Sequence, residues 1–204
     1  MNLRRLIAGI ILATAMSPAF AGPFPYRDFS AAVISNSGGP GSLFGPAVSG
    51  TFSIAPNLAA IASGSYVSGS NAHLANVAAG AEYHWTVKRN LDLLAGLEFV
   101  HYSASETVYF PGVGLLAGGS TSSGLDAHAG ARYWATRFLE VDGYVDIPSC
   151  AGCSAGLTAE GRYYLNHSLS LDGILVSSDS AWYGTTVGVG FTYVFGSPAG
   201  KASD

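Results

Sequence analysis

The feature that most constrains the fold is a short alternating segment that recurs five times along the chain. In its clearest copy, 190–195, three aromatic residues alternate with smaller ones. Such a period of two is typical of a β-strand, because successive side chains leave opposite faces of the pleat. Each copy has an aromatic residue at its centre, and these five residues are Phe52, Tyr83, Tyr133, Tyr163 and Tyr193.

The spacing of the central aromatics predicts a series of hairpins. Successive intervals are 31, 50, 30 and 30 residues. An interval of about 30 residues accommodates two strands of roughly 10–12 residues with a turn and a loop, which is one hairpin of a membrane barrel. Five hairpins predict an all-β fold, an antiparallel up-and-down transmembrane β-barrel of about ten strands, with eight strands as the alternative. The expected strands are 28–36, 43–54, 58–68, 73–87, 91–102, 124–135, 138–147, 156–165, 169–178 and 185–195.

The composition agrees with a barrel that is apolar outside and polar inside. Hydrophobic residues make up 49% of the chain and charged residues only 11%. After the first 21 residues there is no apolar run long enough to span a membrane as a helix, which takes about 20 residues. High apolar content without apolar runs is what alternating lipid-facing and lumen-facing residues produce.

The N-terminus predicts export. Arg4 and Arg5 precede a short apolar run and a small-residue cleavage site ending at Ala21, so 1–21 is interpreted as a secretory signal peptide. The barrel domain is then expected over 22–195, with a polar tail over 196–204. Without the signal the chain has seven basic and thirteen acidic residues, a formal charge of −6. This charge argues against nucleic acid as a partner.

Short and long connections alternate along the chain. Tight turns are expected at 55–57, 88–90, 136–137 and 166–168, and all four should lie at one end of the barrel. The five central aromatics should form a ring near that end. The longest connection, 103–123, is expected to be a loop at the other end and could bind a surface partner. Its apolar part, 108–116, could equally extend the preceding strand above the membrane, which is the simpler account.

The last strand resembles the C-terminal assembly signal of the small outer-membrane β-barrel proteins of Gram-negative bacteria. The matching residues are Gly190, Tyr193 and Phe195. The chain departs from that family in having Gly188 where a polar residue is usual and in continuing past Phe195. The resemblance implies a place in the cell outer membrane, contact with outer-membrane lipids and lipopolysaccharide, and handling by the barrel-assembly machinery.

The sequence is compatible with several functions. The first is a non-enzymatic integral outer-membrane protein, either structural or a narrow cation-preferring channel. The second is surface adhesion or binding through 103–123, with an unknown ligand. The third is a hydrolase that resembles the outer-membrane lipid A deacylases. Its candidate catalytic residues are His101 and Ser103, which share the lipid-facing side of one strand.

Charged residues on the inward-facing side predict a polar lumen. Charges in a narrow interior must be paired or hydrated. Arg132 and Arg162 are therefore expected to act as hubs, each contacting more than one carboxylate and helping to block free passage. The predicted network consists of Glu82, Asp92, Glu98, Asp126, His128, Arg132, Glu140, Asp142, Glu160 and Arg162.

The two cysteines predict a local disulfide and not a redox site. Cys150 and Cys153 lie in a loop of an exported chain, without a following helix or a second cysteine pair. No metal site and no cofactor are predicted.

Overall fold

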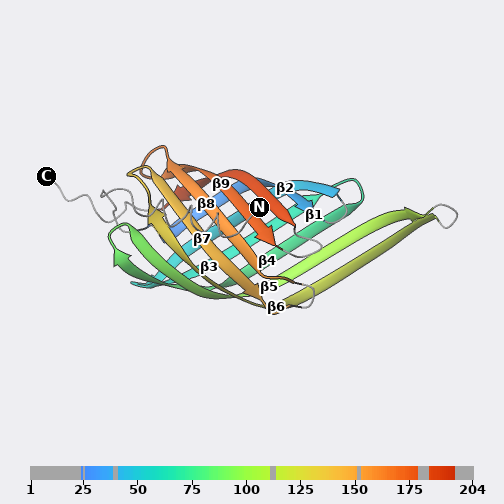
Figure 1. Ribbon diagram of the computed structural model, residues 1–204, viewed down its shortest axis with the longest axis horizontal. Coiled ribbons are helices and arrows are strands. Elements are labelled where there is room, and N and C mark those ends of the chain that lie inside the picture. The colour runs from blue at the N-terminus through green and yellow to red at the C-terminus, as the bar shows by residue number, and fades with distance from the viewer. Residues whose placement is uncertain are drawn as a thin grey trace, which may run out of the picture.

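The computed structural model describes residues 24, 26–38, 41–110, 114–150, 153–178 and 184–195. Within them ten antiparallel strands close into one barrel, which confirms the predicted fold and strand number (Figure 1). The predicted signal peptide and the tail 196–204 lie outside the described residues. The strands are β1 Arg27–Gly38, β2 Gly41–Ala55, β3 Leu58–Ser68, β4 Ala72–Lys88, β5 Leu91–Phe110, β6 Gly114–Trp134, β7 Leu139–Pro148, β8 Gly156–Tyr164, β9 Leu169–Ser178 and β10 Thr185–Val194.

Each strand pairs with its neighbours in the chain, and β1 pairs with β10 to close the wall. The up-and-down order places the four predicted tight turns at one end, as expected; this end is called the turn end, and the opposite one the loop end. No helix among the described residues is long and apolar enough to cross a membrane.

The central aromatics lie at one depth near the turn end. Each pairs with the first residue of a neighbouring strand. The pairs are Phe52 with Arg27, Tyr83 with Leu58, Tyr133 with Leu91, Tyr163 with Leu139, and Tyr193 with Leu169. The ring predicted from the sequence spacing is therefore present.

The predicted long loop is wrong, and the alternative, an extension of the preceding strand, is confirmed. Residues 103–110 and 114–123 continue β5 and β6, which pair without a break from Leu91 with Tyr133 to Phe110 with Gly114. The two strands form a hairpin that projects past the loop end of the barrel (Figure 1). Outside the apolar belt there is no need for apolar alternation, so the Ser, Thr and Gly residues of this hairpin have the composition of a loop while the backbone keeps its ladder.

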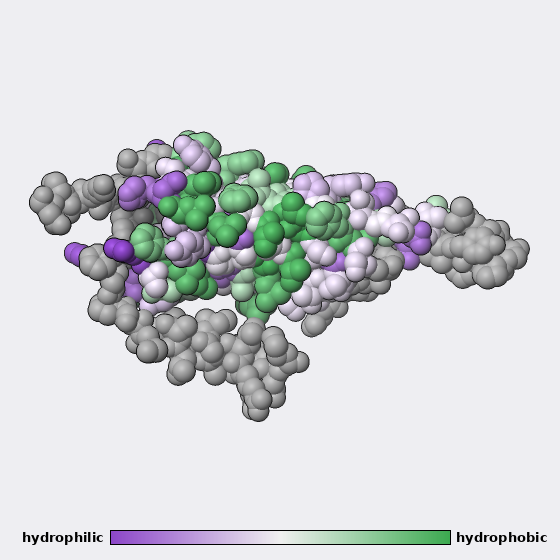
Figure 2. All heavy atoms as spheres, turned by 90° about the horizontal axis from the view of Figure 1, so that it is seen from above, coloured by the Kyte–Doolittle hydropathy of each residue, from purple (hydrophilic) through white to green (hydrophobic). Residues whose placement is uncertain are grey.

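The two faces of the wall have opposite character. Large apolar side chains are exposed all along the outward face, among them Phe99, which is 57% exposed, and Val189, which is 66% exposed. They form an apolar zone across the middle of the molecule (Figure 2). The inward face carries most of the charged residues, including the buried Asp92, Glu140 and Arg162. This inside-out arrangement is the reverse of that in a water-soluble protein.

Candidate functional site

The turn end of the lumen is closed by two aromatic residues that precede β1. Phe24 and Tyr26 are buried there, and together with Ala59 and Leu94 they form an apolar cluster against which Trp134 packs. The Phe24 and Trp134 rings are stacked with centroids 5.8 Å apart. The chain before β1 therefore folds back into the barrel and occludes this end.

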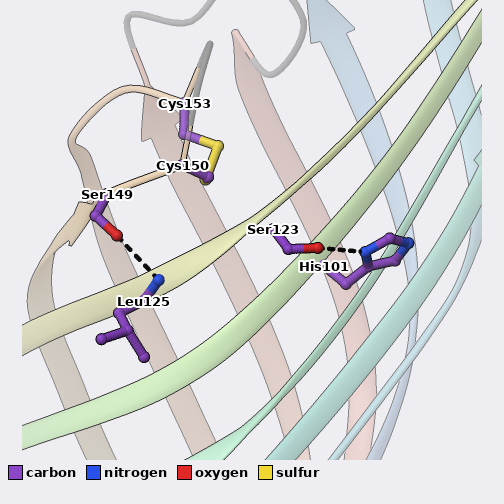
Figure 3. The surroundings of a disulfide bond; sticks show 6 residues. All are labelled: His101, Ser123, Leu125, Ser149, Cys150 and Cys153. Carbon is purple, nitrogen blue, oxygen red and sulfur yellow. Dashed lines mark hydrogen bonds between the residues drawn. A yellow bond between two sulfur atoms is a disulfide. The ribbon is translucent and has the colours of Figure 1, made fainter.

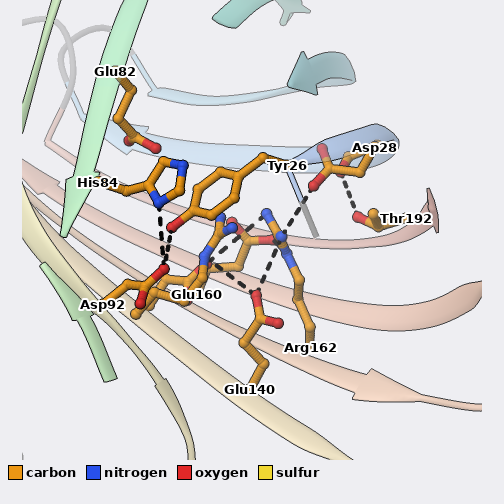
Figure 4. Close-up of polar contacts among 12 residues, drawn as sticks. Tyr26, Asp28, Glu82, His84, Asp92, Glu140, Glu160, Arg162 and Thr192 are labelled. Carbon is orange, nitrogen blue, oxygen red and sulfur yellow. Dashed lines mark hydrogen bonds and ion pairs between the residues drawn. The ribbon is translucent and has the colours of Figure 1, made fainter. Parts of the chain in front are cut away.

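Tyr26 joins the aromatic closure to the polar interior. Its ring stacks on His84 with centroids 3.7 Å apart, and its hydroxyl donates a hydrogen bond of 2.7 Å to Asp92 Oδ2 (Figure 4). Burial raises the pKa of the Tyr26 phenol, so the hydroxyl keeps its proton. The Arg132 guanidinium lies over the Tyr26 ring at 5.1 Å from its centroid. A cation over an aromatic face is attracted by the ring quadrupole.

Arg132 and Arg162 both contact several carboxylates. Arg132 Nε lies 3.2 Å from Asp142 Oδ2 and 3.4 Å from Glu140 Oε1. Arg162 Nε lies 2.7 Å from Glu160 Oε1, and its NH1 lies 3.4 Å from the same Glu140 oxygen. Arg162 NH1 also reaches Asp28 Oδ2 at 3.6 Å. The two guanidinium groups thus share a central carboxylate, Glu140, which is fully buried.

Glu140 receives a further hydrogen bond from a neighbouring strand. The Tyr164 hydroxyl donates to Glu140 Oε2 at 3.0 Å. Both carboxylate oxygens are therefore bonded, one to cations and one to a phenol. Because β6, β7 and β8 each supply a member of this cluster, it ties three adjacent strands together through the lumen.

Two smaller groups extend the network around the wall. His128 lies between two carboxylates, with Nε2 3.2 Å from Glu82 Oε2 and Nδ1 3.4 Å from Glu98 Oε1. Near the seam of the barrel, Asp172 accepts hydrogen bonds from Ser170 at 2.6 Å and from Thr192 at 2.5 Å. The second group links β9 to the closing strand β10.

All ten residues of the predicted network lie on the inward face, but their environments differ. Asp126 Oδ1 is buried without a hydrogen-bond partner, whereas most of the others are paired. Sequence reasoning missed Phe24 and Tyr26, because a proline-rich lead-in without alternation gives no sign of its docking site. Alternation within β7 and β8 did indicate that Glu140, Asp142 and Arg162 would point into the lumen.

Among the described residues, the lumen includes two cavities. The smaller, of about 140 Å³, lies among the residues of the arginine network, and its lining includes Glu82, Asp142 and Arg162. The larger, of about 310 Å³, lies closer to the loop end. Carboxylates on its wall are Glu98, Asp126, Asp146 and Glu160.

Acids exceed bases strongly inside the barrel. The two inward arginines, together with His84 and His128, face ten acidic residues. The acidic residues are Asp28, Glu82, Asp92, Glu98, Asp126, Glu140, Asp142, Asp146, Glu160 and Asp172. A low-dielectric wall around excess negative charge attracts cations and repels anions. Among the described residues, no group of His, Cys, Asp or Glu side chains is arranged to hold a metal ion.

The candidate pair of His101 and Ser103 is not joined by a hydrogen bond in the described structure. His101 faces outward at the loop-end rim, but its Nδ1 lies 2.7 Å from Ser123 Oγ on β6 and not beside Ser103 (Figure 3). Cross-strand pairing explains the difference, because β5 and β6 align His101 with Ser123. Ser103 lies two residues further along the same strand, opposite Thr121.

The remaining predicted sites lie at the two ends of the barrel. Cys150 and Cys153 are joined by a disulfide at the loop end, with their Cα atoms 5.4 Å apart (Figure 3). At the turn end Tyr193 and Phe195 contact each other edge to face with centroids 5.2 Å apart. Gly190 lies further along β10, facing the lumen against Ala32. Whether these three residues act as an assembly signal stays a prediction.

No known protein family and no curated protein sequence matches the chain. Solved structures with a similar barrel include the N-terminal domain of OprF from Pseudomonas aeruginosa, at 14% identity and a TM-score of 0.42, covering 84% of this chain and 100% of that one. Neisserial surface protein A has 17% identity and a TM-score of 0.40, with 82% and 95% coverage. Ail from Yersinia pestis has 12% identity and a TM-score of 0.41, with 82% and 95% coverage.

Proposed function

We propose that this protein is an integral outer-membrane barrel whose constricted lumen prefers cations. The apolar outward face, bounded at the turn end by a ring of aromatic residues, suits lipid and lipopolysaccharide around the barrel. The barrel-assembly machinery would be a transient partner through the C-terminal strand. The excess of inward carboxylates over inward cations is the observation that carries the preference for cations.

The constriction has two parts. The arginine network fills the middle of the lumen, and Phe24 and Tyr26 occupy the turn end. A barrel of about eight strands is already filled by its own side chains, and ten strands add only a little width. The proposed passage is therefore narrow, and the network also serves to hold the shape of the barrel.

Ion selectivity in planar bilayers tests this function. Under a potassium chloride gradient the reversal potential should have the sign of cation selectivity, with small unit currents. Arg162→Ala should enlarge the current and strengthen the selectivity, because it removes a positive charge from the constriction. Anion-selective currents in the unmutated protein would contradict the proposal, as would large currents that Arg162→Ala does not change.

The proposed role does not involve catalysis. The His101–Ser123 pair has the two groups of a base and a nucleophile, so replacing its serine tests directly whether the protein is a hydrolase. Lipid A extracted from cells that express the protein should have the same acyl composition with Ser123→Ala, with Ser103→Ala and without either change. Loss of an acyl chain that depends on Ser123 would show an enzyme instead.

The projecting hairpin of β5 and β6 supports surface binding as a second function. Its strands extend past the ladder that β6 makes with β7, which ends at the pair of Asp126 with Pro148. A ribbon held above the lipid surface is accessible to partners outside the cell, and it is polar along 117–123 and mostly apolar along 108–116. Deleting 104–122 while keeping the barrel should abolish such binding and leave ion selectivity unchanged.

A further inference from the structure

Strand β6 is paired along one edge over its whole length but along the other edge over only part of it. β5 accompanies it from Gly114 to Tyr133, whereas β7 pairs only from Asp126 to Trp134. Among the described residues, no strand lies against the second edge of 114–125. This stretch is the projecting part of β6 (Figure 1).

The ladder between β6 and β7 ends in a defined way. Pro148 has no N–H to donate, and the next residue, Ser149, terminates the pairing. The Ser149 amide donates to the Leu125 carbonyl at 2.7 Å, and the Leu125 amide donates to Ser149 Oγ at 3.0 Å (Figure 3). Cys150 of the disulfide lies beside Gly124, where an added Cβ would come within 2.8 Å of the Cys150 amide nitrogen.

These contacts identify the groups that point toward the free edge. In an antiparallel strand the N–H and C=O of one residue point to the same side, and the side alternates from residue to residue. Both groups of Leu125 point toward β7, so those of Ser123, Thr121, Gly119 and Ala117 point toward the free edge. The close contact of His101 with Ser123 fits this parity, because side chains approach most closely in the pairs that exchange no backbone hydrogen bonds.

The chemistry of this edge defines the kind of ligand that it would bind. Donors and acceptors recur at every second residue, roughly 6.8 Å apart, and an extended polypeptide has the same repeat. Flanking side chains are small and uncharged throughout 117–124, so they offer no pocket and no charge to select a partner. Prolines and lysines, which commonly protect exposed edges, do not occur in 117–124.

We propose that the free edge of β6, residues 117–123, binds an extended segment of a partner protein as an added antiparallel strand. The segment would occupy the place in which β7 would have continued, so it extends a pairing that the barrel already makes. Recognition would come mainly from main-chain hydrogen bonds, with weak sequence preference. This inference rests on the surface role proposed for the hairpin and names its partner class.

Amide hydrogen exchange in detergent-solubilised full-length protein tests the edge residue by residue. Amides of Gly118, Ser120 and Ser122, which bond to β5, should exchange slowly. Those of Ala117, Gly119, Thr121 and Ser123 should exchange fast, and they should become protected when a peptide is added. The probe is a short acetylated peptide of alternating threonine and valine with lysine at its ends, chosen because the edge selects for extended backbone.

Matched reagents separate strand addition from general adhesion. The same peptide N-methylated at every residue cannot donate main-chain hydrogen bonds, and it should bind roughly tenfold more weakly or worse. Thr121→Pro removes one free-edge donor while leaving the ladder to β5, because proline is tolerated on edge strands where its nitrogen faces solvent. It should weaken binding by a similar factor, whereas Thr121→Val, of similar shape and with its N–H intact, should bind as the unmutated protein does.

Three results would overturn the proposal. The first is that the peptide does not protect the free-edge amides. The second is that the N-methylated peptide binds as tightly as the unmethylated one, or that Thr121→Pro binds the peptide as tightly as the unmutated protein does. The third is concentration-dependent protection without peptide, which would assign the edge to a second copy of this chain. Peptide-dependent protection confined to other amides of the hairpin would contradict the edge as the site and leave the surface role of the hairpin standing.

Discussion

The turn-end half of the lumen and the projecting hairpin contain parts of the same strands, yet they satisfy their polar groups in different ways. Inside the barrel, side chains from β6, β7 and β8 meet across the lumen, and Arg162 alone reaches Asp28, Glu140 and Glu160. In the hairpin, the backbone ladder between β5 and β6 supplies most of the order, and one side of β6 has no described strand against it.

This difference shows what closure of the wall adds to a β-sheet. A closed barrel brings strands that are distant in the chain to face one another, so charged side chains must find partners and the network becomes specific. A two-stranded ribbon has no interior and is marginally stable alone. The hairpin therefore depends on the barrel beneath it, and its variants should change stability less than variants of the lumen.

Removing Arg162 should have the largest effect. Arg162→Ala leaves Glu140, Glu160 and Asp28 without a shared cation, and breaking a buried pair typically costs about 3–5 kcal/mol, less where water enters. The free energy of unfolding in detergent micelles, measured by urea titration, should fall toward that range. The matched control is Arg89→Ala in an exposed turn, which should change it by less than about 0.5 kcal/mol. Equal effects of the two variants would contradict the hub role.

Truncating Tyr26 should have the next largest effect, on stability and on closure of the turn end. Tyr26→Ala removes the ring stacked on His84 and the donor to Asp92. Truncation of a buried aromatic residue costs about 3 kcal/mol or more where the site cannot collapse. Tyr26→Phe, which loses only the hydrogen bond, should cost about 1–2 kcal/mol.

Conductance separates these two tyrosine variants further. Tyr26→Ala should raise the unit current in planar bilayers, whereas Tyr26→Phe should leave it close to that of the unmutated protein. If Tyr26→Ala conducts no better, then Phe24 and Tyr26 do not limit passage, and the arginine network alone closes the lumen.

Glycines in the wall provide a third, smaller test of the packed half. A Cβ at Gly130 would lie 2.3 Å from the Gly143 carbonyl oxygen and 2.5 Å from Tyr144 Cβ. Gly130→Ala should therefore lower the free energy of unfolding by about 1–3 kcal/mol through overpacking. Gly173→Ala is the control, because a Cβ there would meet nothing within 4 Å, and it should stay within about 0.5 kcal/mol. Similar losses for both would show that the wall tolerates no added side chain anywhere.

The disulfide at the boundary of the two regions should have the smallest effect. Cys150 and Cys153 should resist thiol labelling until a reductant is added. They close a loop with a sequence separation of only 3, and a 15-residue loop corresponds to about 3 kcal/mol, so Cys150→Ser with Cys153→Ser should cost less than that. A loss as large as that of Arg162→Ala would show that the junction, not the lumen, controls the stability of the barrel.

The strands and their inward residues could be predicted only where apolar and polar residues alternate in the sequence. In β7 the inward and outward sets are distinct in sequence, so the alternation alone places Glu140 and Asp142 in the lumen. In 103–107 and 117–123 the side chains are small or polar on both faces, so no alternation marks these parts of the strands and the sequence predicts a loop. His101 contacts Ser123 and not its candidate partner Ser103 for a related reason. Spacing along one strand says nothing about which residue of the neighbouring strand stands opposite.

The sequence by itself determined the class of fold, the strand number and the inward face of the strands that alternate clearly, because a period of two sorts side chains locally, without reference to any other strand. Only the tertiary structure decided which inward groups meet: Arg132 and Arg162 both contact Glu140, and Tyr26 contacts Asp92 and His84. It also decided which outward groups pair across strands, as His101 does with Ser123. These contacts depend on strand register, closure of the barrel and the fold-back of the lead-in segment. All three depend on residues far apart in the chain, so no local pattern specifies them.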